Sequence, residues 1–380
     1  MSEQVCEILW SKKMQEYFNS LTPNMPEGLR GRYIGYVNEN ARARGASEVT
    51  ELDIITALLR NTPVFFRQNI SNIPKDIKVD LSPLTKRDLT LMSDDIEKAA
   101  KIAEVGCNKD LVNKILNVYE EQFSHPQVAV SFRTTTKPAE KRSLDVRYVD
   151  VWTSHDPYAM AIENGLLVKS GHPVDNLFYD IKSNFPIMGY GVDFGVLNGF
   201  AKIWMRIPTH LPVPLEKLQL IPSFPDSLKN YINLLSKYSM DRIIMVGIDY
   251  IHKSTNIYFV KRYYGDLSTE TVTSLISELG FPVPSNELIE ECAHALFFYC
   301  TFTWDSPKIE RLSFHRVAHD QSQVPVHLHP FLEKYSLNAP ILGDKRKFMY
   351  TVALSPKGNY IKLESDYSSG IMADALVETY

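Results

Sequence analysis

The sequence predicts an α+β protein in which a ten-stranded antiparallel barrel is surrounded by helices and preceded by a small helical domain. Three observations support this. From residue 128 onward, short segments of alternating apolar and polar residues occur in pairs with tight connections, which is typical of β-hairpins. Helical patterns separate the pairs, so that a hairpin recurs roughly every 50 to 57 residues. In each strand one face is apolar and the other is polar and rich in aromatic residues.

Composition limits the functional classes. The 380 residues carry a formal net charge of −4, and 44% of them are hydrophobic, as in a globular protein with a full core. A general binder of nucleic acid or anionic membranes would need a basic excess, so we expect neither as a partner. The N-terminus lacks a signal-peptide pattern, and no apolar stretch approaches the length of about 18 residues that a membrane helix needs. We therefore expect a cytoplasmic protein.

The chain divides, on pattern, into a helical appendage at residues 1–75, a connector with the first outer helices at 76–127, and a barrel at 128–380. In the appendage, residues 29–43 are predicted to form a helix that ends at Gly45. Thr50 and Asp53 have the spacing of a capping box for the next helix. Residues 74–83 are charged and contain proline, as expected for a connector.

Short motifs in the appendage resemble the small helical domain at the end of the B subunit of light-independent protochlorophyllide reductase. The motifs are Trp10, the run RGRY at 30–33 and the run ARARG at 41–45. This resemblance implies no chemistry, but it hints at a photosynthetic source. The alternative is a generic helical appendage.

Five hairpins make up the predicted barrel. They pair residues 128–134 with 143–152, 185–194 with 199–208, 241–250 with 255–265, 295–304 with 309–317, and 346–355 with 359–366. Short links make partner strands antiparallel, and the helices predicted at 175–183, 225–238, 269–279 and 328–335 would cover the apolar face. Ten strands can remove their edges by closing into a barrel that is wide enough for a ligand. The alternative is an open sheet with its polar face in water.

Residues 199–207 carry the clearest sign of a binding site. With period two, one face of this strand is apolar and the other carries Phe200, Lys202, Trp204 and Arg206. Cations interleaved with aromatic rings suit an anion that is attached to an apolar group. The alternative is an exposed strand whose Lys and Arg extend into solvent.

Other predicted strands repeat this arrangement. Their polar faces offer Arg133, Arg311 and Lys357, with Asp145 as the main acid. This imbalance favours a closed barrel, because cations from several hairpins would then meet in one interior.

Residues 128–367 resemble the soluble aromatic prenyltransferases of the ABBA, or prenyltransferase-barrel, family, in particular its bacterial members. The motifs occur in order as TSHDPY at 153–158, GHPVDN at 171–176, GFAK at 199–202, IPS at 221–223, NIYF at 256–259, KIER at 308–311, GDKR at 343–346 and LSPK at 354–357. The family fold is a ten-stranded barrel with outer helices, which agrees with the fold predicted above.

The resemblance implies roles for individual residues. The diphosphate of an allylic donor would be bound by Arg133, Lys202, His252, Asn256, Tyr258, Tyr299, Arg311 and Lys357, of which Lys202, Tyr299 and Arg311 would be catalytic. The prenyl chain and the aromatic acceptor would lie against Trp204, Tyr258, Tyr350 and Ile361. Asp145 matches the carboxylate that holds Mg²⁺ in metal-using members, so Mg²⁺ is a candidate cofactor, either required or dispensable.

The chemistry is consistent with these residue types. Ionisation of a prenyl diphosphate requires cations on the leaving group, and aromatic faces stabilise the allyl cation by roughly 0.5–2 kcal/mol each. We therefore expect transfer of a dimethylallyl or longer group to an electron-rich aromatic acceptor in secondary metabolism, with an indole-type acceptor if the photosynthetic hint holds. His315 is a candidate base. The alternative is a non-catalytic barrel that binds a phosphorylated or prenylated small molecule.

Overall fold

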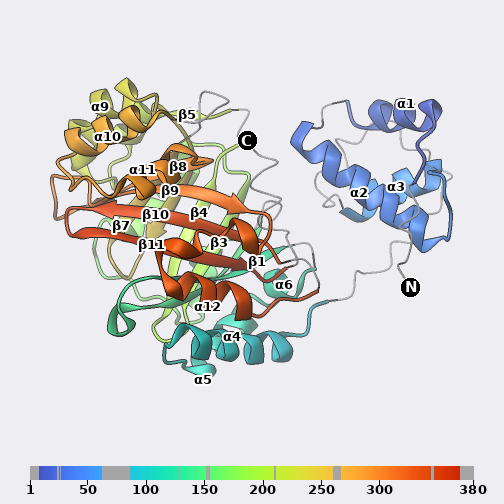
Figure 1. Cartoon of the computed structure of the whole chain (residues 1–380), viewed down its shortest axis with the longest axis horizontal. Coiled ribbons are helices and arrows are strands. Elements are labelled where there is room, and N and C mark those ends of the chain that lie inside the picture. The colour runs from blue at the N-terminus through green and yellow to red at the C-terminus, as the bar shows by residue number, and fades with distance from the viewer. Residues whose placement is uncertain are drawn as a thin grey trace. The chain divides into compact units, whose positions relative to one another are not determined.

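The structure is a computed structural model that describes residues 8–23, 25, 27–61, 86–126, 128–150, 155–208, 211–259, 267–343 and 346–368 (Figure 1). The chain divides into two compact units, Met1–Thr85 and Lys86–Glu378. Three predicted segments lie outside the described residues: the connector at 74–83 and the strand ends at 151–152 and 260–265.

The first unit is a small helical domain with its own core. Its helices are α1 (Lys12–Leu21), α2 (Glu27–Ala43) and α3 (Glu51–Asn61). Gly45, at φ 70°, follows α2 in the left-handed conformation that suits glycine. The predicted capping box is present, because the Thr50 backbone N–H donates to Asp53 at 2.8 Å. Arg44 also donates to Asp53, at 2.9 Å.

The second unit contains the predicted closed barrel of ten antiparallel strands. The strands are β1 (Ala129–Thr135), β2 (Leu144–Asp150), β3 (Gly189–Gly195), β4 (Gly199–Arg206), β6 (Arg242–Asp249), β7 (Ser254–Phe259), β8 (Phe297–Thr303), β9 (Arg311–Ala318), β10 (Phe348–Ser355) and β11 (Gly358–Asp366). Pairing of β1 with β11 and of β4 with β6 closes the barrel. The two-residue strand β5 (Val213–Pro214) adds to the side of β6.

The topology places all five hairpin turns at one end of the barrel. Each hairpin (β1–β2, β3–β4, β6–β7, β8–β9 and β10–β11) has a short turn, and every neighbouring pair of strands is antiparallel. Consecutive strands therefore alternate in direction, and the turns share one end, which we call the hairpin end. The longer connections that contain helices lie at the other end.

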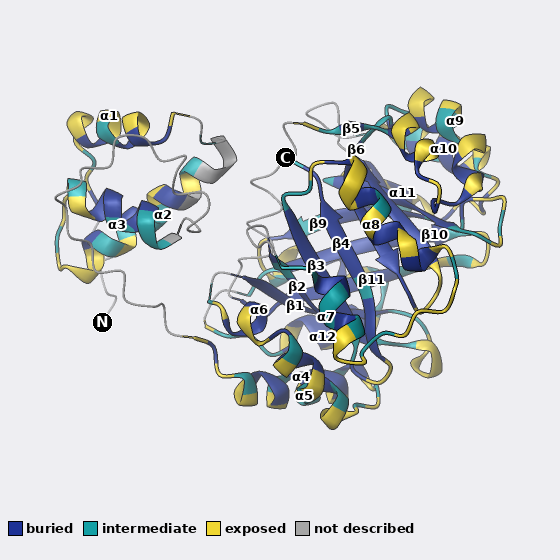
Figure 2. Ribbon diagram, turned by 180° about the vertical axis from the view of Figure 1, so that it is seen from behind, coloured by how far each residue is buried: buried dark blue, intermediate teal, exposed yellow. Residues whose placement is uncertain are grey.

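Helices cover the outside of the barrel (Figure 2). They are α4 (Leu89–Ala103), α5 (Lys109–Val118), α6 (Glu120–Ser124), α7 (Pro157–Glu163), α8 (Val174–Asn184), α9 (Ile232–Lys237), α10 (Thr269–Glu278), α11 (Asn286–Ala293) and α12 (Pro330–Asn338). Their apolar faces pack with the outward strand residues, such as Phe298 and Phe314, in one core. Within the described residues, no helix combines the length and the apolar character needed to cross a membrane.

The predicted alternation of residues 199–207 fails at Phe200. A β-bulge shifts the register, because Asp193 pairs with Lys202 whereas the next residue, Phe194, pairs with Phe200. Phe200 therefore packs on the outside of the barrel, stacked on Tyr119 at 6.3 Å. From Lys202 onward the alternation holds.

Candidate active site

The barrel interior contains two groups of charged side chains. The first group, which we call the phenol cluster, consists of Tyr299 on β8, Arg311 on β9, and Tyr360 and Lys362 on β11. The second, the carboxylate cluster, consists of Arg133 on β1, Asp145 and Arg147 on β2, Asp193 on β3 and Glu364 on β11. The strands bring residues more than 200 positions apart in the sequence into one interior.

In the phenol cluster, tyrosine hydroxyls are the close partners of the cations. Lys362 donates to the hydroxyl of Tyr299, and Arg311 donates to the hydroxyl of Tyr360 at 3.1 Å. Neither cation makes an ion pair with a carboxylate of the described residues. Within the described part of the chain, the groups that accept hydrogen bonds from these two cations are therefore weak acids.

The cations change the acidity of both phenols. Burial alone would raise their pKa values, but Lys362 and Arg311 lower the pKa of Tyr299 to about 6 and that of Tyr360 to about 7. Burial and the neighbouring Arg311 together lower the pKa of Lys362. The cluster thus has a strong local positive potential, which favours binding of an anion.

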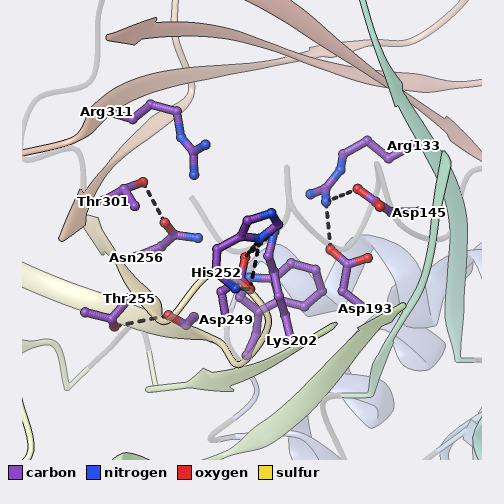
Figure 3. Close-up of polar contacts among 12 residues, drawn as sticks. Arg133, Asp145, Asp193, Lys202, Asp249, His252, Thr255, Asn256, Thr301 and Arg311 are labelled. Carbon is purple, nitrogen blue, oxygen red and sulfur yellow. Dashed lines mark hydrogen bonds and ion pairs between the residues drawn. The ribbon is translucent and has the colours of Figure 1, made fainter. Parts of the chain in front are cut away.

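Lys202 and Asn256 extend this region toward β4 and β7 (Figure 3). Lys202 lies 3.1 Å from Asp249, which also accepts from the backbone N–H of His252 at 2.8 Å. Thr301 donates to the amide oxygen of Asn256 at 2.7 Å. This contact orients the Asn256 amide so that its NH₂ group is the end left to donate to a ligand.

The carboxylate cluster is internally neutralised. One nitrogen of Arg133, Nη2, donates to Asp145 at 2.6 Å and to Asp193 at 2.7 Å. Arg147 forms an ion pair with Glu364 at 2.6 Å. Ser131 also donates to Glu364, at 2.5 Å, and burial raises the pKa of the Glu364 carboxyl to about 7. This cluster therefore presents much less unbalanced charge than the phenol cluster.

Aromatic rings border the phenol cluster. Tyr258 and Tyr299 are neighbours on β7 and β8, with ring centroids 4.6 Å apart. Trp204 donates from Nε1 to the hydroxyl of Tyr258 at 3.2 Å. The His315 ring stacks on Phe297 at 4.3 Å. These rings make the interior next to the cations apolar and π-rich.

The indole of Trp204 lies flat against the barrel wall. A Cβ added at Gly191 on β3 or at Gly247 on β6 would come within 3.0 Å and 2.8 Å of the ring, respectively. The Arg147 guanidinium lies over the ring, 4.3 Å from its centroid. Two glycines and an arginine thus fix the position of this side chain.

The structure places two of the predicted diphosphate ligands at the hairpin end. His252 lies in the exposed turn between β6 and β7, where its ring contacts Asp249 at 3.0 Å. Lys357 lies in the exposed turn between β10 and β11. Lys202, Asn256, Tyr258, Tyr299 and Arg311, by contrast, all point into the interior.

The predicted placement of Tyr350 and Ile361 in the prenyl pocket is wrong. Both belong to the outer core, and Tyr350 donates to Glu291 of the outer helix α11 at 2.6 Å. Alternation along β10 and β11 directs their neighbours Met349, Thr351, Tyr360 and Lys362 inward instead.

Sequence reasoning missed several interior residues, of which Lys362 and Glu364 are the most important. A signal for them exists, because Tyr360, Lys362 and Glu364 alternate with Ile361 and Leu363 along β11. The pattern has the same period as the one that identified Lys202 on β4.

The residues around Asp145 do not fit a divalent metal ion as they are arranged. The Arg133 guanidinium already contacts Asp145, so a metal ion there would lie against a positive charge. Among the described residues, no group of three or more His, Cys, Asp or Glu side chains is arranged to hold a metal.

A closed barrel whose interior holds cations beside neighbouring phenol rings agrees with the aromatic prenyltransferase fold that the sequence predicts. The comparison with known families agrees. The model of the aromatic prenyltransferase Orf2 family matches residues 87–378, and the chain belongs to this family. The first 86 residues lie outside that match, so the resemblance noted for the appendage stays a prediction.

Three bacterial relatives are similar over most of their length. The chain is 32% identical to 5,10-dihydrophenazine-1-carboxylate 9-dimethylallyltransferase of Streptomyces anulatus, over 73% of this chain and 92% of the relative. It is 32% identical to flaviolin linalyltransferase of Streptomyces virginiae, over 72% and 90%. It is 31% identical to the furaquinocin biosynthesis prenyltransferase of a Streptomyces strain, over 72% and 88%. The protein is therefore a prenyltransferase.

Proposed function

We propose that this enzyme transfers a dimethylallyl group from dimethylallyl diphosphate to an electron-rich aromatic acceptor. The donor's diphosphate lies across Lys202, Asn256, Arg311 and Lys362. The observation that carries this proposal is the phenol cluster, where two cations inside a barrel donate hydrogen bonds to phenols and form no ion pair with a carboxylate among the described residues. A diphosphate supplies the negative charge that this arrangement lacks.

The reaction breaks one bond and makes another. The C–O bond of the donor ionises, and diphosphate leaves with the electron pair while Lys202, Arg311 and Lys362 balance its growing charge. The allyl cation forms beside the rings of Tyr258 and Tyr299, whose faces favour positive charge. An electron-rich atom of the acceptor ring then attacks the cation, and the barrel wall excludes water meanwhile.

The attacked ring must lose a proton, and we assign this proton to Glu364. A carboxyl with a pKa of about 7 accepts protons efficiently near neutral pH. His315 is a poorer candidate, since burial and the nearby Lys362 lower its pKa far below the usual range. Its ring instead forms part of the apolar wall with Phe297.

Two observations limit the choice of donor and acceptor. Trp204 is held flat by Gly191 and Gly247, so a bulky fixed ring borders the prenyl site and favours a short donor. The named relatives act on a dihydrophenazine carboxylate and on flaviolin, which makes a fused, electron-rich ring system the acceptor class that we favour. An indole is a second acceptor to test.

The experiment is a product assay with a small panel of substrates. Dimethylallyl and geranyl diphosphates are incubated with a dihydrophenazine carboxylate, flaviolin, a naphthol and an indole, with and without Mg²⁺. Mass spectrometry of the acceptors detects alkylated products. We expect alkylation of at least one acceptor, with dimethylallyl diphosphate used in preference to geranyl diphosphate.

The second candidate is a barrel that binds a prenyl diphosphate without transferring it. The exposed His252 and Lys357 at the hairpin end would suit capture of a phosphorylated molecule. Tight binding of dimethylallyl diphosphate by calorimetry, with no product from any acceptor, would favour this candidate and contradict transfer for the substrates tested.

A further inference from the structure

We propose that Arg133 acts as a built-in cation in place of Mg²⁺, so that this enzyme turns over its donor without a divalent metal. The inference rests on the proposed function, because it concerns the donor site of that reaction. It also assigns a specific task to a residue that the sequence suggested only as one more diphosphate ligand.

The geometry of Arg133 is that of a bridging cation. A single nitrogen atom, Nη2, lies within 2.7 Å of both Asp145 and Asp193. These carboxylates come from neighbouring strands, β2 and β3, and Asp193 is almost fully buried. Two carboxylate oxygens that converge on one point would suit a divalent ion if the guanidinium were absent. The chain itself fills that point with a positive charge.

The position is next to the donor site. Asp193 is the register partner of Lys202 across β3 and β4, and Lys202 is one of the residues assigned to the diphosphate. The positive charge of Arg133 therefore acts on the same leaving group that a metal ion would neutralise. A fixed guanidinium requires no recruitment from solution and is always charged.

A guanidinium and a divalent ion cannot share this point. Any metal bound to Asp145 would lie against the Arg133 nitrogen that already contacts the same carboxylate. One buried nitrogen of Arg133, Nε, has no hydrogen-bond partner among the described residues.

The test is to remove the guanidinium and ask whether a metal replaces it. Arg133→Gln keeps a polar side chain but deletes the charge, and Arg133→Gln combined with Asp145→Asn also removes a carboxylate. Arg133→Lys is the charge-preserving control. Donor turnover is measured with EDTA and with millimolar MgCl₂, and Mn²⁺ binding is followed by electron paramagnetic resonance on protein without substrates.

For the native enzyme, we expect turnover with EDTA and with MgCl₂ to agree within about twofold. Arg133→Gln should lose at least about tenfold of its turnover in EDTA, regain most of it with MgCl₂, and bind Mn²⁺ at least about tenfold more tightly than the native protein. The double variant should lose its turnover in EDTA, and MgCl₂ should not restore it. Arg133→Lys should stay independent of metal.

The inference is overturned if EDTA abolishes native turnover and MgCl₂ restores it, or if the native protein binds Mn²⁺ as tightly as Arg133→Gln. Failure of the proposed function looks different, because the native protein would then form no product in either condition. The Mn²⁺ titration still decides the inference in that case. If circular dichroism shows that Arg133→Gln does not fold, turnover in EDTA and in MgCl₂ is compared for Arg133→Lys and the native protein instead.

Discussion

The two charged clusters of the barrel interior each contain two cationic side chains, but the partners of these cations differ. In the carboxylate cluster, Arg133 and Arg147 are each bound to acidic side chains at ion-pair distance. In the phenol cluster, the hydrogen bonds that Arg311 and Lys362 donate to other described residues go to tyrosine hydroxyls. A carboxylate partner neutralises part of the charge of a buried cation, whereas a cation beside phenols keeps most of its charge for a ligand. We therefore expect the diphosphate of the donor to bind beside the phenol cluster.

The most direct test of the difference between the two clusters is to remove a cation from the phenol cluster. Lys362→Met and Arg311→Gln should each lower kcat/KM for the donor by about 10²- to 10³-fold, because each deletes a charge that stabilises the leaving diphosphate in the transition state. The measurement is steady-state kinetics with the donor varied at a saturating concentration of acceptor.

The matched control lies on the same strand as Arg311. Arg316, on the outer face of β9, forms an ion pair with Glu291 of α11. Arg316→Gln should leave donor kinetics unchanged within about twofold, since its charge faces away from the interior. Equal losses in Arg311→Gln and Arg316→Gln would contradict a special role for the phenol cluster.

The second prediction concerns Glu364, the member of the carboxylate cluster that we assign as the proton acceptor. Because burial raises the pKa of Glu364 to about 7, the carboxyl is protonated below this pH and cannot accept a proton. Native kcat should therefore fall as the pH drops through about 7. Glu364→Gln should lower kcat by about 10²-fold and remove this dependence.

An acid on the outside of the barrel provides the control for this pH profile. Glu291→Gln changes a carboxyl that contacts Tyr350 and Arg316 outside the interior. Its profile should match that of the native enzyme. A profile of Glu364→Gln that still falls below pH 7 would assign the proton to another group.

The sequence was sufficient to predict the barrel because alternation is a local signal. Each strand shows its inward face within a few residues, and five hairpins with helices between them leave few arrangements that bury the apolar faces. The inward direction of Lys202, Asn256, Tyr299 and Arg311 followed from the same alternation.

The errors have physical causes that are also local. Along β11 the inward residues are Tyr360, Lys362 and Glu364, and a shift of one residue in the alternation gives Ile361 instead. At Phe200 a β-bulge interrupts the alternation of inward and outward residues within a single strand. The pairing of Arg133 with Asp193 joins residues 60 positions apart, and it depends on the register of β2 against both β1 and β3.

The third prediction concerns Trp204, which lies between the two clusters. Trp204 contacts Arg147 of the carboxylate cluster and donates to Tyr258 beside the phenol cluster. Trp204→Leu should enlarge the prenyl site and raise kcat/KM for geranyl relative to dimethylallyl diphosphate by about tenfold. Competition between the two donors in one reaction measures this ratio directly.

The smallest effect is expected at Lys357, the lysine that the family motif suggested. Its side chain lies in the exposed β10–β11 turn, where water and salt screen its charge from a diphosphate in the interior. Lys357→Gln should therefore change donor kcat/KM by less than about twofold at physiological ionic strength, against the large loss in Lys362→Met. If the two variants were equally impaired, the exposed turn would have to close over the donor, and the division between the clusters would no longer explain which lysine binds the substrate.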